Sequence, residues 1–180
     1  MPPKPRPSEA VAKPPTVLAS SVVIAEAASL TGTFPIKIGA NTVIHPRAKL
    51  TSAQGPITIG EHCIICERTQ ICPPGAEGLV IEDGVVVEVN AVVEGSVGAG
   101  SVVEVGVRIG KGGSVGLNCK LGPLTKVLEG EVIEDNTVIF GSGQRRVDAS
   151  GTADARRRLL ERHIESLRVL IPSNPSKFVN

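Results

Sequence analysis

The side chains best suited to metal chemistry gather near the middle of the chain. His62 and Cys63 are adjacent, Cys66 follows Cys63 in a C-x-x-C spacing, and Cys72 lies further along. Zinc takes three or four thiolate or imidazole ligands in a tetrahedral arrangement, so the ligand types are right. Whether these four side chains converge depends on the elements that carry them.

Two other residues could serve in acid–base chemistry. His45 could act as the general base of an acyl transfer, and Glu77 is the one acid in the segment CPPGAEGLV (72–80). Loops of this kind hold substrate in some enzymes. No carboxylate that would orient His45 is evident, however. We expect 72–80 to be a plain surface loop. We predict no catalytic residue, no metal site and no cofactor.

A period of six residues organises most of the chain. An α-helix needs a spacing near 3.6 and a hairpin sheet needs simple alternation, so a strict six indicates a corner every six residues. Large aliphatic residues recur at this spacing, with short shifts of register, at Leu18, Ile24, Leu30, Ile38, Ile44, Leu50, Ile59, Ile65, Ile71, Ile81, Val87, Val93, Val97, Val103, Ile109, Val115, Leu121, Val127, Ile133 and Ile139.

Residues that favour a left-handed backbone occur in phase with this repeat. Asn and Gly adopt positive φ most readily, and they stand three residues after the aliphatic at Asn41, Gly84, Asn90, Gly100, Gly106, Gly112, Asn118 and Asn136. His62 occupies the same position, which gives this histidine a structural role. Four residues after the aliphatic come small residues such as Ala48 and Cys63, which we expect to point inward.

Three six-residue rungs close a triangular coil. The sequence therefore predicts an all-β solenoid, a parallel β-helix of about seven coils, in which backbone hydrogen bonds join successive coils. The repeat phase turns Cys63 inward and Cys66 and Cys72 outward on successive faces, which argues against a zinc site. After the repeat, 153–171 shows helical spacing and ends before Pro172.

The chain divides into three parts. Residues 1–16 are rich in proline and predicted to form a flexible arm, 17–143 form the β-helix, and 144–180 form a basic connector, a C-terminal α-helix and a tail. With 19 basic and 18 acidic residues, the charge gives no reason to expect nucleic acid as a partner. No apolar stretch suggests membrane insertion, and four cysteines without an export signal are expected as cytoplasmic thiols.

The basic C-terminal part is a candidate interface. Its charges could dock an acidic protein surface, although most such runs are solvated helix faces. The apolar stripe of the helix could cover the solenoid itself or pack on a partner. The candidate interface residues are Arg145, Arg146, Arg157, Leu160, Ile164 and Leu167.

Three segments carry a resemblance: IGANTVIHPRAKL (38–50), GPITIGE (55–61) and VIEDNTVIFGSGQRRV (132–147). The exit from the repeat, in 136–141 followed by Arg145-Arg146-Val147, is the most specific because a rung repeat does not dictate it. On these residues the chain is similar to the dynactin subunit 6 family of hexapeptide-repeat proteins. The resemblance implies a left-handed coil, against the usual crossover rule.

The resemblance also implies a function. Members are structural subunits of the dynactin pointed-end complex, so it implies a cytoplasmic, cytoskeleton-associated hetero-oligomer that supports dynein-based cargo transport along microtubules. The implied partners are the β-helical dynactin subunit 5 and other pointed-end subunits, including an actin-related protein.

The hexapeptide class also contains acyltransferases and γ-class carbonic anhydrases, so an enzyme remains the alternative. The γ-class enzymes use three histidines around a metal and an Arg-Gly-Asp segment. This chain has only His45, His62 and His163, and 31–33 reads Thr-Gly-Thr. A three-histidine site could be completed only by ligands shared between chains.

Overall fold

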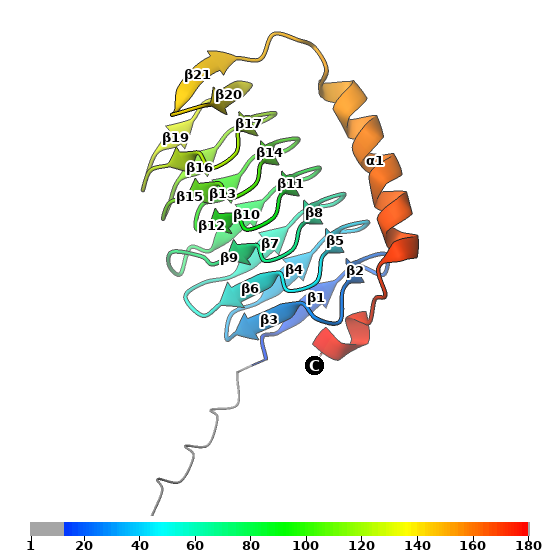
Figure 1. Cartoon of the computed structure of the whole chain (residues 1–180). Coiled ribbons are helices and arrows are strands. Elements are labelled where there is room, and N and C mark those ends of the chain that lie inside the picture. The colour runs from blue at the N-terminus through cyan, green and yellow to red at the C-terminus, as the bar shows by residue number, and fades with distance from the viewer. Residues whose placement is uncertain (1–12, 180) are drawn as a thin grey trace, which may run out of the picture.

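Three parallel sheets form the walls of a triangular prism (Figure 1). The computed structural model describes residues 13–179. The first wall contains β1 (Thr16–Leu18), β4 (Ile36–Ile38), β7 (Ile57–Ile59), β10 (Leu79–Ile81), β13 (Ser96–Val97), β16 (Ser114–Val115) and β19 (Val132–Ile133). The second contains β2 (Val23–Ile24), β5 (Val43–Ile44), β8 (Ile64–Ile65), β11 (Val86–Val87), β14 (Val102–Val103), β17 (Lys120–Leu121), β20 (Thr137–Phe140) and β21 (Gln144–Val147). The third contains β3 (Ser29–Gly32), β6 (Lys49–Ser52), β9 (Gln70–Ile71), β12 (Val92–Val93), β15 (Arg108–Ile109) and β18 (Lys126–Val127).

The strands complete six coils and begin a seventh. β19 and β20 belong to the seventh coil, but the chain then turns back, and β21 pairs antiparallel with β20, with Thr137 opposite Val147. The predicted left-handed parallel β-helix with a C-terminal helix is confirmed. The predicted count of about seven coils includes this incomplete one. The hexapeptide repeat ends in it, at Ile139.

Successive coils are joined by backbone hydrogen bonds and by side chains stacked in the interior. The Val86 N–H donates to the Ser101 carbonyl at 3.1 Å, and the repeat aliphatics from Ile24 to Ile139 are buried. Buried polar side chains also reach the next coil, since the Thr42 hydroxyl donates to the Gly60 carbonyl at 2.8 Å. Each coil is therefore stabilised by its neighbours.

The corners use a left-handed backbone. All eight predicted Asn and Gly corner residues have positive φ, from 54° at Asn118 to 68° at Gly100 and Gly106. His62 has a φ of 53°, as its position suggested. Arg47, Arg68 and Leu124 also have positive φ. Arginine and leucine rarely adopt this conformation, so their residue types do not predict it.

Helix α1 (Ala153–Leu170) runs back along the second wall toward the first coil (Figure 1). Ile164 and Leu167 pack on the outward side chains of Val23, Val43 and Ile64. The apolar stripe therefore covers the chain's own solenoid.

The chain after α1 covers the end of the first coil. Ser173 forms an antiparallel bridge with Ala25, and the 3₁₀ helix η1 (Pro175–Phe178) follows. Phe178 is 6% exposed and belongs to the same core as the repeat aliphatics. Its carbonyl accepts a hydrogen bond from the Thr16 hydroxyl at 2.6 Å. Most of the predicted proline-rich arm, 1–12, lies outside the described residues.

We expect Phe178→Ala to lower the free energy of unfolding by about 3–5 kcal/mol, because it removes a buried ring that closes one end of the core. Chemical denaturation followed by circular dichroism measures the change. Val179→Ala is the control, since Val179 is 46% exposed. Equal stability of the two variants would show that Phe178 does not close the core.

Candidate interaction surfaces

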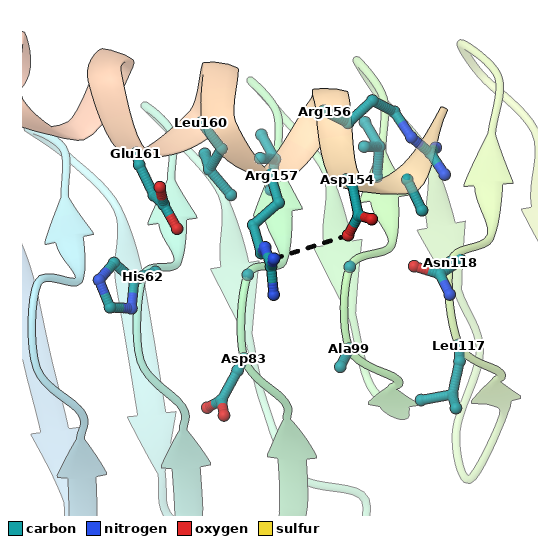
Figure 2. Close-up of a pocket in the computed structure, with 15 residues that line it drawn as sticks. His62, Asp83, Ala99, Leu117, Asn118, Asp154, Arg156, Arg157, Leu160 and Glu161 are labelled. Carbon is teal, nitrogen blue, oxygen red and sulfur yellow. Dashed lines mark ion pairs between the residues drawn. The ribbon is translucent and has the colours of Figure 1, made fainter. Parts of the chain in front are cut away.

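A groove lies between the first half of α1 and the corners that join the first and second walls. It has a volume of about 570 Å³, and Figure 2 shows the side chains that line it. Leu160 projects from the helix, while Val86 and Val102 form part of the wall. His62, Gly84, Gly100 and Asn118 form the corners here, and the two glycines between the others have no side chain under the helix.

Charges of both signs line this groove. Arg157 extends from α1 toward the corners of Asp83 and Ala99, and its guanidinium lies 3.5 Å from the Asp154 carboxylate (Figure 2). Asp83 Oδ1 accepts a hydrogen bond from the Glu61 N–H at 2.7 Å. The mixed charge and apolar floor suit a polar protein segment better than a single strongly charged ligand.

The six predicted interface residues lie in three places. Ile164 and Leu167 are 2% and 9% exposed and face the second wall, and Leu160 and Arg157 line the groove. Arg145 and Arg146 lie exposed on β21, at the far end of the prism.

The Glu131 carboxylate links two parts of this far end. It pairs with Arg145 and accepts a hydrogen bond from the Leu128 N–H at 2.7 Å. The bond to the Leu128 N–H and the pairing with Arg145 lower the pKa of Glu131.

The cysteines are separated by the repeat, as its phase predicted. Cys63 points inward, its thiol donates to the Glu82 carbonyl at 3.0 Å, and burial raises its pKa to about 12. Cys66 points outward beneath α1, where burial raises its pKa to about 11. In residues 13–179, no three His, Cys, Asp or Glu side chains are placed to hold a metal ion.

His45, His62 and Glu77 lie at three different corners of the triangle. The His62 Nε2 lies 3.1 Å from the Asn41 Nδ2 at the first corner of successive coils. His45 follows β5, and Glu77 lies between β9 and β10, at a different corner of the triangle. The structure therefore does not join His45 and Glu77 into an acid–base pair.

His45 is half-buried, and its Nε2 has no hydrogen-bond partner among residues 13–179. Burial lowers its pKa below the ordinary value of 6.5; Glu67 opposes this shift, and His163 on α1 adds to it. Below about pH 6.5 the unfolded chain takes up the proton more readily than the folded chain, so folding stability falls as the pH falls.

We expect His45→Gln to reduce the loss of stability between pH 7 and pH 5, because glutamine removes the titrating group. Urea denaturation at several pH values gives the slope. His163→Gln, at an exposed position on α1, should change the slope less, because His163 makes the smallest of the three contributions to the pKa of His45. An unchanged slope in His45→Gln would show that His45 does not cause the acid sensitivity.

We expect Ile164→Asp to release α1 from the second wall, since it places an unpaired charge in a buried apolar contact. Hydrogen exchange of the α1 amides should accelerate at least tenfold. Leu159→Asp is the matched control on the same helix, because Leu159 is 69% exposed. Equal protection in both variants would mean that the stripe does not hold the helix.

Solved structures share this architecture. A candidate acetyltransferase of Bacillus cereus superposes with a TM-score of 0.76 at 21% identity, covering 88% of this chain and 92% of that one. A hexapeptide transferase family protein of Anaplasma phagocytophilum superposes with a TM-score of 0.70 at 16% identity, covering 88% and 95%. At these identities the likeness concerns the fold alone. No profile of a known protein family matches the chain.

The fold, its six-residue rungs and its left-handed corners define a hexapeptide-repeat left-handed β-helix protein. Among curated proteins, dynactin subunit 6 of Nematostella vectensis is 32% identical over 140 residues, which cover 71% of this chain and 75% of that protein. Dynactin subunit 6 of Dictyostelium discoideum is 29% identical over 163 residues, covering 88% and 85%. The chain belongs to the dynactin subunit 6 family.

The chain also matches part of an enzyme. The bifunctional protein GlmU of Clostridium botulinum is 30% identical over 104 residues, but these cover only 21% of that protein. No helix in residues 13–179 is long and apolar enough to span a bilayer.

Proposed function

We propose that the chain is a non-catalytic structural subunit of dynactin. The observation that carries the proposal is the match to dynactin subunit 6 proteins, which at 29% identity extends over 88% of the chain. In this role it lies in the pointed-end complex and binds dynactin subunit 5, a second β-helix, next to other subunits that include an actin-related protein. The assembly is a cytoplasmic, cytoskeleton-associated hetero-oligomer that supports dynein-dependent transport of cargo along microtubules.

The reactive side chains support a structural role. The Cys63 thiol is buried and donates a hydrogen bond, and its raised pKa keeps it protonated, whereas zinc binds the thiolate. His62 serves at a corner beside Asn41. These groups are engaged in holding coils together.

The shape of the molecule also supports binding to other proteins. Stacked coils give three flat walls and two ends, and α1 covers part of one wall (Figure 1). Such a prism offers large rigid faces whose side chains are fixed by the walls, so little ordering is needed when a partner docks.

Affinity purification tests the proposal. The tagged protein, recovered from its native cytosol at moderate salt, should bring with it a second hexapeptide β-helix protein, an actin-related protein and other dynactin subunits. Mass spectrometry identifies these proteins, and native mass gives the size of the complex. The control bait is an unrelated hexapeptide β-helix enzyme with the same tag.

A different result would favour the enzyme alternative. A homotrimer that holds zinc, or that turns over acetyl-CoA, without dynactin subunits would contradict the proposal. In that case the histidines of neighbouring chains would have to be tested as shared ligands.

A further inference from the structure

The two ends of the prism differ. The first coil is covered by η1 and by the bridge between Ser173 and Ala25. At the other end, β21 covers the edge of β20, but within residues 13–179 no strand pairs with the outer edges of β18 and β19. Backbone groups at those edges are available to another strand.

Apolar side chains surround the uncovered end. Leu124, Leu128, Val132 and Val147 are 75%, 67%, 69% and 71% exposed, and we refer to these four residues as the end rim. They flank or belong to the last strands of all three walls. The terminal coil of a solenoid usually presents a polar outer face, so this end departs from what a free end requires.

Leu124 adds a second observation. The Leu124 N–H donates to the Val105 carbonyl, so Leu124 stacks on the corner that Gly106 forms in the preceding coil. The φ of Leu124 is 60°. Asn90, two coils below, has the same conformation. Leucine in this conformation brings its β-carbon against the following carbonyl oxygen, and an exposed leucine gains no burial in return. A partner that buries Leu124 would supply that gain.

The edge of β18 is held by a side chain in place of a strand. The Leu128 N–H, which points along the stack, donates to the Glu131 carboxylate, and Arg145 pairs with the same carboxylate. A backbone carbonyl of an added coil could take this N–H in place of Glu131. The edge is thus protected in the free chain and convertible to strand pairing.

The geometry specifies the kind of partner. β18 and β19 belong to adjacent walls and are separated by one corner, so two strands joined by an equal corner are needed to pair with both. The coil of a second parallel β-helix has this shape. Charges of both signs flank these edges, with the exposed Glu129 and Glu134 beside β19 and the exposed Lys126 on β18, so shape and strand pairing specify the partner more than charge does.

A second copy of this chain does not fit. Continuing the stack requires a partner with a free first coil, and the first coil here is covered by its own Phe178 and Ser173. We propose that the end rim, with the outer edges of β18 and β19, docks the uncovered first coil of a different parallel β-helix protein. This proposal rests on the proposed function and assigns the surface that the second β-helix subunit occupies.

Two rim variants test the proposal. Leu124→Asn places the residue type of Asn90 in the same backbone conformation, so the fold should be retained with an equal or higher melting temperature. Val132→Lys adds a charge to the rim. With the second β-helix subunit that co-purifies with the wild-type chain as the probe, each variant should weaken binding about tenfold or more. Leu159→Asn on the outer face of α1 is the control and should bind as the wild type does.

Cross-linking locates the contact directly. A photoreactive amino acid at Leu128 should label the first coil of the partner, whereas the same group at Val17, 60% exposed in the covered first coil, should not. Unchanged binding by both rim variants, or partner labelling only from Val17, would overturn the proposal. Labelling between two copies of this chain at Leu128 would also overturn it, since the rim would then serve self-association. A wild-type chain that recovers no second β-helix protein contradicts the proposed function, a result distinct from recovery that is insensitive to the rim.

Discussion

Every coil of this protein depends on hydrogen bonds to the coils before and after it. The bond from the Val86 N–H to the Ser101 carbonyl is one of a series that runs the length of the prism, and the Thr42 and Ser101 hydroxyls add side-chain bonds in the same direction. A coil has no core of its own, because its inward aliphatics are buried only when the coils on either side cover them. The fold therefore propagates well and terminates poorly.

The C-terminal part deals with the surfaces that this architecture leaves open. β21 pairs with the last strand of the second wall, α1 covers the apolar outer side chains of that wall, and Phe178 closes the core at the first coil. These three elements follow one another in sequence, and they lie at the last coil, along the second wall and at the first coil, respectively (Figure 1). The groove beneath α1 is lined by Gly84 and Gly100, which carry no side chain where the helix passes.

The sequence predicted the repeated part of this structure because each coil states the same requirement again. Buried Ile65 and left-handed Asn90 follow from position in the period, and the stripe that includes Ile164 predicted the helix. β21 and the Phe178 cap were not predicted, since neither repeats and neither has a local pattern of its own. The positive φ of Leu124 was not predicted either, because leucine disfavours the conformation that the corner position requires.

The closure of the first coil has a consequence for biosynthesis. The chain emerges from the ribosome from its N-terminus, so the residues of β1 to β3 are made well before Phe178. Until Phe178 has been made, the nascent solenoid lacks the residue that covers its first coil. We expect ordered structure to start among the middle coils, which have neighbours on both sides, and the first coil to be fully covered only after η1 has been made. A chain truncated before η1 would keep its first coil uncovered, with strand edges that other proteins could bind.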